Sequence, residues 1–187
     1  MRVRSVLCFA LIACLAFVGC SGSAKKADVI KIGWFGPLTG DTALWGQAEF
    51  NTVKLRVDDL NAQGGLKVGE KMYKIEAIGY DDKGDSTEAV NVAKRLISQD
   101  HVVAIVGAQG SSEAIPVAPI VNEAKVPLVA TLATNPKVTV TEAGTVNPYM
   151  FRACFTDPYQ GKVAAYFAYQ RLGKLKAAIF MQRPGLV

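Results

Sequence analysis

Residues 101–136 read HVVAIVGAQGSSEAIPVAPIVNEAKVPLVATLATNP, and this stretch decides the fold that we expect for the chain. It contains two short apolar runs, Val102 to Val106 and Pro127 to Thr131. Such runs, rich in aliphatic and β-branched residues and bounded by Gly or Pro, are typical of buried strands. The segment between them is long enough to hold a helix of thirteen or so residues that crosses from one parallel strand to the next. The stretch therefore predicts a strand–helix–strand unit.

The segments that follow these two strands, GAQGSS and TLATNP, are expected to form a small polar site. Parallel strands end on the same side of a sheet, and ligands of open α/β sheets bind there. Glycines and small hydroxyl residues in both segments suit a small polar ligand. Ser112 is the expected N-cap of the crossover helix, although Ser111 and Ser112 could exchange roles. Pro116 and Pro119 are expected to kink or offset its first turns.

Strand and helix patterns alternate before this unit. VIKIGWF and KMYKIEAIGYDD are expected strands, and two helices are expected after them. The first helix ends at Gly64 and Gly65, and the second begins at an N-cap Asp85 followed by Glu88 and runs to about Gln99. Their inner faces are predicted from helical spacing as Phe50, Val53, Val57 and Leu60, and as Ala89, Ala93, Leu96 and Ile97. The alternation predicts a three-layer α/β sandwich with a mainly parallel sheet.

The chain after Pro136 is expected to begin a second α/β unit. YMFRACF is a short strand or connection, and TDPYQ starts a helix with Asp157 as N-cap. Its predicted apolar face comprises Val163, Ala164, Phe167 and Ala168, and Gly173 closes it. One more strand is expected from Lys176 to Phe180. This unit ends without partners, so the sequence is expected to be an N-terminal fragment.

Composition and motifs exclude several classes of function. The formal net charge is +5, and no Lys or Arg cluster alternates with aromatic residues, so no nucleic acid partner is expected. Dinucleotide and P-loop fingerprints are absent. His101 is the single histidine, expected in a helix-to-strand loop, and no Cys-x-x-Cys occurs. Asp81 and Asp82 are expected in a turn rather than at a cation. No metal, cofactor or catalytic residue is predicted.

The first 28 residues are expected to be an export signal followed by a lipidated linker. Residues 1–19 combine two arginines with an apolar run too short to span a bilayer, as a signal peptide does. The run ends in FVGCSGS, which resembles a bacterial lipobox, so Cys20 is expected to carry lipid and residues 20–28 to form a linker. Cleavage after Ala24 is the alternative. With Cys8 and Cys14 removed, Cys154 would remain without an intramolecular disulfide partner.

Five blocks in order resemble one family. IKIGWFGPLTGDTALWGQ, LNAQGGLKVGEKMYKIEAIGYDDKGD, VVAIVGAQGSS, VPLVATLATNP and FRACFTDPYQGKVAA are similar to the periplasmic branched-chain amino acid binding proteins of ABC transporters. The resemblance implies a type I periplasmic-binding fold, in which two lobes close on a small amphipathic amino acid or a relative of one. Residues 29–149 would form the first lobe, and residues 150–187 would form the hinge crossing and the start of the second.

The resemblance also implies a set of ligand-binding residues. Ser111 would hold the ligand α-carboxylate, Thr134 would contact carboxylate and ammonium, and the Leu132 carbonyl would accept from the ammonium. Trp45 would form the aromatic wall beside the ligand side chain, whereas its position alone leaves core packing equally open. Hydroxyl groups at a helix start suit an anion, and an aromatic face suits alkyl groups. The complete predicted set is Trp45, Ser111, Ser112, Leu132, Ala133 and Thr134.

Two departures and two alternatives accompany the resemblance. Some members link the two positions that correspond to Gly84 and Gly110 by a disulfide, which neither glycine can form. The final residues, MQRPGLV, lack the aromatic ligand contact that the family's second lobe supplies. The expected function is the substrate-binding component of an amino acid ABC importer, with a membrane permease as partner. A ligand-sensing domain of the same fold and an enzyme with a Rossmann-like sheet are the alternatives.

Overall fold

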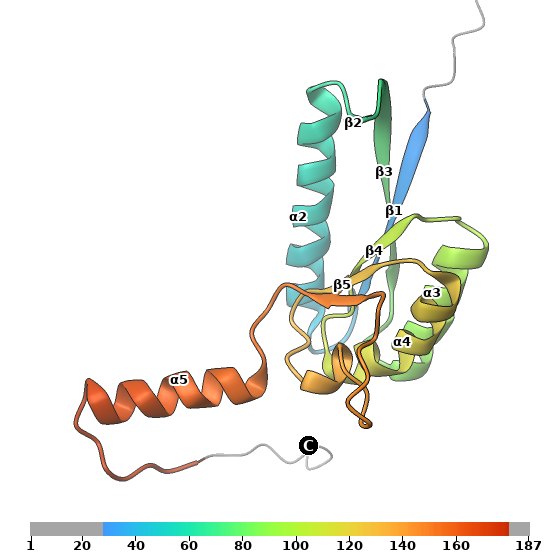
Figure 1. The fold of residues 1–187 in the computed structure, drawn as a ribbon. Helices are drawn as coiled ribbons and strands as arrows, with labels where there is room; N and C mark the ends of the chain where they lie inside the picture. Colours follow the sequence, from blue (N-terminus) through green and yellow to red (C-terminus); the bar gives the residue numbers. More distant parts are fainter. Residues whose placement is uncertain (1–27, 180–187) are drawn as a thin grey trace, which may run out of the picture.

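The computed structural model describes residues 28–179 and shows helices and strands in alternation (Figure 1). The strands are β1 (Val29–Gly36), β2 (Leu66–Val68), β3 (Lys71–Asp81), β4 (Ala104–Gly107), β5 (Leu128–Ala130) and β6 (Met150–Arg152). The helices are α2 (Ala43–Ala62), α3 (Ser86–Ser98), α4 (Ser111–Ala124), the 3-10 turn η1 (Pro136–Val138) and α5 (Asp157–Gln170).

The six strands form one sheet in the order β2-β3-β1-β4-β5-β6. All pairs are parallel except β2 with β3, which are antiparallel. The strand–helix–strand unit predicted from residues 101–136 is confirmed as β4–α4–β5, although each strand is shorter than expected or displaced by one or two residues. The sequence did not predict β2, whose three residues are all exposed.

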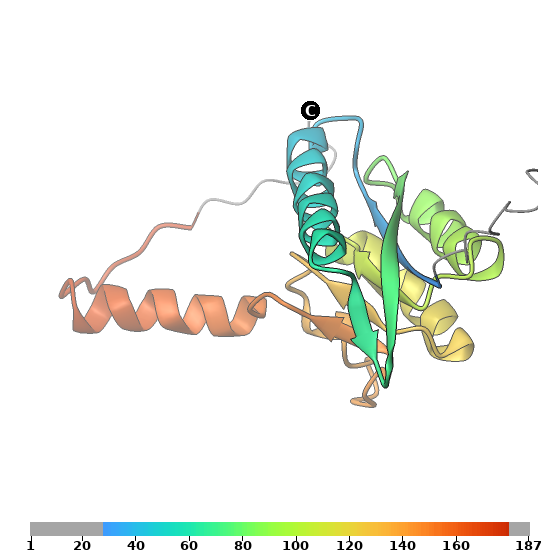
Figure 2. The same ribbon diagram turned by 90° about the horizontal axis from the view of Figure 1, so that it is seen from above.

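Helices cover both faces of the sheet, which confirms the three-layer sandwich. Seen from above, α2 lies on one face and α3 and α4 lie on the other (Figure 2). The core gathers between the sheet and the α3–α4 pair, where Phe35, Leu96, Ile105 and Leu128 are fully buried. Burial of this apolar area is the main force that holds the layers together.

Helix α2 packs through the face that the sequence predicts, because Phe50, Val53, Val57 and Leu60 are all half-buried. Phe50 stacks on Trp34 of β1, with ring centroids 4.7 Å apart. Gly46 permits the close approach of the helix to the preceding loop, since a Cβ there would collide with the Pro37 carbonyl oxygen. The predicted end of the helix is confirmed: Gly64 and Gly65 follow it with positive φ angles, and the Gly65 N–H donates to the Leu60 carbonyl.

Helix α3 begins as predicted. Asp85 is its N-cap, and the Asp85 carboxylate accepts from the backbone N–H groups of Thr87 at 2.8 Å and Glu88 at 2.9 Å. Ala89, Ala93 and Leu96 of the expected inner face are buried, together with Val92, and Ile97 is half-buried. His101 lies exposed in the loop to β4, as expected.

The prediction for the start of α4 is wrong by two residues. Gly110 is the N-cap, so Ser112 lies inside the first turn and caps nothing. A glycine N-cap is possible because its extended backbone, with φ −91° and ψ 154°, already aims the carbonyl into the helix. Pro116 and Pro119 lie inside α4, which continues through both to Ala124.

Two expectations for the last part of the chain are wrong. Thr156, not Asp157, is the N-cap of α5, and Pro158 follows within the first turn. Residues 176–179 form no strand, and Phe180 lies outside the described residues. An isolated strand cannot satisfy its backbone N–H and C=O groups, and no neighbour for it exists among residues 28–179.

Helix α5 extends away from the sheet (Figure 1). None of its residues is buried, and Val163 and Phe167 of its predicted apolar face are 47% and 54% exposed. The division into a lobe of residues 29–149 and a second lobe from residue 150 stays a prediction. Within residues 28–179, no helix combines the length and the apolar character that crossing a membrane requires. The expected signal peptide and Cys20 lie outside the described residues.

Candidate functional site

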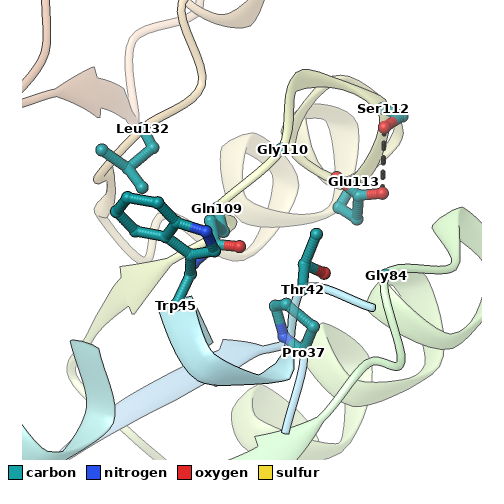
Figure 3. Close-up of a pocket in the computed structure, with 9 residues that line it drawn as sticks. All are labelled: Pro37, Thr42, Trp45, Gly84, Gln109, Gly110, Ser112, Glu113 and Leu132. Atoms are coloured by element: carbon teal, nitrogen blue, oxygen red, sulfur yellow. Dashed lines mark hydrogen bonds between the residues drawn. The ribbon is translucent and has the colours of Figure 1, made fainter. Parts of the chain in front are cut away.

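A cavity of about 570 Å³ lies at the carboxyl ends of β1, β3, β4 and β5. This is the edge at which ligands of parallel α/β sheets bind. Figure 3 shows its lining, which comes from the loop after β1, the start of α2, the turn after β3, the start of α4 and the segment after β5. The lining residues are Pro37, Thr42, Trp45, Gly84, Gln109, Gly110, Ser112, Glu113 and Leu132.

Trp45 is the third residue of α2 and forms one wall of this cavity. Its side chain is 67% exposed, so core packing, one of the two roles left open by the sequence, does not describe it. In Figure 3 its ring lies beside the side chain of Leu132, which is 48% exposed. Together they offer an apolar surface in a cavity that Thr42, Gln109, Ser112 and Glu113 also line with polar side chains.

Ser111 is the first residue of α4, and its hydroxyl joins two predicted site segments. Its Oγ accepts from the backbone N–H of Asn135 at 3.1 Å, which fastens the segment after β5 to the helix start. A hydroxyl can accept and donate at once, so the O–H of Ser111 remains available to an anion. Ser112 instead donates from its Oγ to Glu113 Oε1 at 2.9 Å.

The segment after β5 is held by Arg152 of β6. Its Nη1 donates to the Ala133 carbonyl at 3.0 Å, and its Nη2 donates to the Asn135 carbonyl at 3.0 Å. Ala133 itself is fully buried, so its side chain cannot line the cavity. Thr134 is half-buried, and its carbonyl accepts from the Asp157 N–H at 3.1 Å. Of the six predicted residues, three line the cavity: Trp45, Ser112 and Leu132.

Glu49 of α2 lies among the strand ends and was not among the site residues predicted from the sequence. Its Oε1 accepts from Trp34 Nε1 at 3.1 Å and from the Thr131 hydroxyl at 2.9 Å. Its Oε2 lies 3.5 Å from Gln109 Nε2. One carboxylate thus connects α2 to residues of β1, of the segment after β4 and of the segment after β5. The one signal in the sequence was its place beside Phe50, on the face of α2 predicted to pack inward.

Two acidic side chains are buried near the cavity: Glu113 lines it, and Asp82 lies two residues before Gly84, which also lines it. Asp82 is fully buried, and Glu113 is 7% exposed. Burial raises the pKa of Asp82 to about 6; the Gly84 N–H, 2.9 Å from its Oδ1, opposes this rise, whereas the negative charge of Glu113 adds to it. Gly110 makes room for Glu113, because a Cβ at that position would collide with the Glu113 carboxylate.

Asp81 has the structural role in a turn that the sequence predicts. Its carboxylate accepts from the Leu38 N–H at 2.7 Å and from the Thr39 hydroxyl at 2.6 Å. Burial acts to raise the pKa of Asp81, but these hydrogen bonds outweigh it, and the pKa lies below its usual value. Within residues 28–179, no three side chains with metal-binding groups converge.

Comparison with known proteins shows which family this fold and cavity define. A family model described as "Periplasmic binding protein" matches residues 29–183. An "Amino acid binding protein" of Pseudomonas aeruginosa PAO1 is 38% identical over 153 residues, which cover 82% of this chain and 38% of that protein.

Solved structures agree with the sequence comparison. The branched-chain amino acid transporter substrate-binding protein LivJ of Streptococcus pneumoniae, in complex with isoleucine, has a TM-score of 0.67 and 32% identity, over 78% of this chain and 39% of that one. A solute-binding protein of an ABC transporter from Rhodopseudomonas palustris BisB5, in complex with 3,4-dihydroxybenzoic acid, has a TM-score of 0.64 and 28% identity. The match covers 77% of this chain and 37% of that protein.

The parallel sheet with a cavity at its carboxyl edge is therefore the fold of type I periplasmic binding proteins. The chain belongs to the periplasmic binding protein family, and it is similar to a branched-chain amino acid binding member of that family. It spans about two fifths of the length of the relatives that it matches.

Proposed function

We propose that this chain is part of the substrate-binding component of an ABC importer for branched-chain amino acids or related small amphipathic ligands. It binds its ligand at the cavity between Trp45 and the start of α4 and catalyses no reaction. One arrangement carries this proposal. The exposed Trp45 faces the start of α4, where the Ser111 hydroxyl accepts one hydrogen bond and can still donate its O–H to a ligand.

The two ends of an aliphatic amino acid match the two sides of this site. Gly110 provides no side chain to cap α4, so the first-turn N–H groups of the helix can meet a carboxylate. The Ser111 hydroxyl adds a charge-assisted hydrogen bond, and Thr134 lies in the segment that Ser111 holds. Trp45 and Leu132 then cover the alkyl side chain, with the Leu132 carbonyl available to the ammonium.

The family also suggests where the protein acts. Its members are periplasmic binding proteins, and the similar LivJ is described as part of a transporter. We therefore place this protein outside the cytoplasm, where it delivers its ligand to a permease of the inner membrane. A lipid on Cys20 would keep it at the membrane surface close to that permease.

The substitutions Ser111→Ala and Thr134→Ala test the ligand site. Each removes a hydrogen bond to a charged group of the ligand, which is worth about 1.5 to 3 kcal/mol, so the dissociation constant should rise about ten- to hundredfold. Isothermal titration of the whole protein with leucine, isoleucine and valine measures it. Matched controls are Ser98→Ala and Thr52→Ala, exposed positions on α3 and α2. Unchanged affinity in both site variants would place the ligand elsewhere.

The lipid anchor is tested at Cys20. Mass spectrometry of the membrane fraction should find an N-terminal diacylglyceryl-cysteine at this position, because the apolar run ends in a lipobox-like segment. Cys20→Ser should release the protein from the membrane, whereas Cys154→Ser should not. A free N-terminus at Lys25 would instead support ordinary cleavage after Ala24.

A further inference from the structure

Gln109 is the polar side chain that the proposed site leaves without a role. It is the second residue after β4, is half-buried and lines the cavity with Trp45 and Leu132. In Figure 3 it lies behind the Trp45 ring, and its amide oxygen points into the space between Trp45, Thr42 and Glu113. The wall that would contact the side chain of an amino acid is therefore not wholly apolar.

Glu49 fixes which end of the Gln109 amide faces the cavity. The Glu49 carboxylate already accepts from the Trp34 indole N–H and the Thr131 hydroxyl, and Gln109 Nε2 lies 3.5 Å from its Oε2. This distance is long for a hydrogen bond, so the contact alone is weak. The reversed amide would nevertheless set its oxygen against a carboxylate, and two acceptors repel. The amide nitrogen is thus directed to Glu49 and the oxygen to the cavity.

The amide oxygen has no donor among residues 28–179, and the lining around it supplies acceptors rather than cations. Glu113, which is 93% buried, contributes a carboxylate to the same cavity, and neither Lys nor Arg lines it. Water can satisfy the oxygen while the cavity is empty. A ligand that displaces this water without offering a donor leaves a buried acceptor unpaired, which weakens binding.

We propose that Gln109, positioned by Glu49, is a specificity-determining residue that selects amino acids whose side chain carries a hydrogen-bond donor, a hydroxyl or an amide, over aliphatic side chains of the same shape. This inference rests on the proposed function and specifies its substrate class. Trp45 and Leu132 accommodate the carbon skeleton of either kind of ligand, so the oxygen of Gln109 decides between them.

Matched ligand pairs test this selection. Threonine and valine differ by a hydroxyl in place of a methyl group, and asparagine and leucine have side chains of similar size. Isothermal titration of the whole protein should show threonine and asparagine binding about tenfold tighter than their aliphatic counterparts. Gln109→Met keeps the length of the side chain and removes the oxygen, so the preference should fall to less than about twofold or reverse.

The ratio of the two dissociation constants within each ligand pair separates a direct contact of Gln109 from a structural role. A substitution that only loosens the cavity would weaken the binding of both ligands of a pair alike. Gln109→Leu serves as a second variant if Gln109→Met is too unstable to measure. Gln99→Met is the control: Gln99 is exposed at the end of α3, so this variant should keep the wild-type preference. Equal or tighter binding of valine and leucine by the wild type overturns the inference, as does an unchanged ratio in both Gln109 variants. If none of the four amino acids binds, the proposed function fails and this inference with it.

Discussion

Replacing Glu49 by alanine should lower the free energy of unfolding by about 3 to 5 kcal/mol, because two donors inside the fold lose their acceptor together. Trp34 is fully buried, so its indole N–H cannot turn to water instead. The Thr131 hydroxyl loses the same partner. Urea denaturation measures the change. The variant should also bind ligand more weakly, since Glu49 connects the helix that carries Trp45 to the segment after β5.

Two other variants make this result specific. Glu70→Ala removes a carboxylate whose side chain is 98% exposed and should change the free energy of unfolding by less than about 0.5 kcal/mol. Glu49→Gln keeps the shape and one acceptor oxygen and should fall between the wild type and Glu49→Ala. If Glu49→Ala were no less stable than Glu70→Ala, the three contacts of Glu49 would contribute nothing to the free energy of unfolding.

The second large effect is a pH dependence that Asp82→Asn should remove. The pKa of Asp82 is raised by burial to about 6 from its ordinary value of 3.8. Below pH 3.8 both states hold the proton; as the pH rises toward 6 the unfolded state releases it first, so the folded state loses stability. A rise of about two pKa units corresponds to at most about 3 kcal/mol. This loss is complete above pH 6.

The measurement is urea denaturation of both proteins between pH 4 and pH 7. Between pH 4 and pH 7, the free energy of unfolding of Asp82→Asn should rise relative to that of the wild type by up to about 3 kcal/mol. Asparagine does not ionise, and its oxygen can still accept from the Gly84 N–H. Asp58→Asn, exposed on α2, controls for the loss of one negative charge. A difference between wild type and Asp82→Asn that stays constant from pH 4 to pH 7 would show that Asp82 does not titrate differently in the two states.

Strong local patterns predicted most of the fold. Buried aliphatic runs located β1, β4 and β5, and the carboxylate of Asp85 located the start of α3. The strand β2 escaped notice because all three of its residues are exposed and it exists only through pairing with β3. The reverse error was made at residues 176–179, where an apolar run suggested a strand that has no partner among the described residues. Pairing is a tertiary property, and a short run does not reveal it.

The sequence predicted those residues of the candidate site that local patterns indicate. It did not predict those that only the folded chain brings together from distant positions. Trp45 and Leu132 stand at the ends of recognisable elements, and both line the cavity. Glu49 and Gln109 lie far apart in sequence, and only the sheet brings them together. The N-cap of α4 was misassigned for a local reason, since Ser112 is the better capping residue by propensity, yet its hydroxyl bonds to Glu113 and the helix starts earlier, after Gly110.

The place of β1 in the middle of the sheet has a consequence for how the chain folds. Both of its neighbours, β3 and β4, come later in the sequence, so β1 has no partner until Asp81 has been made and lacks its second partner until Gly107 has been made. The β2–β3 hairpin, closed by Gly69 and Glu70, can form locally, whereas β1 has to wait. During that wait its Trp34 and Phe35, fully buried in the finished fold, stay exposed, which makes the nascent chain a substrate for chaperones and a hazard for aggregation.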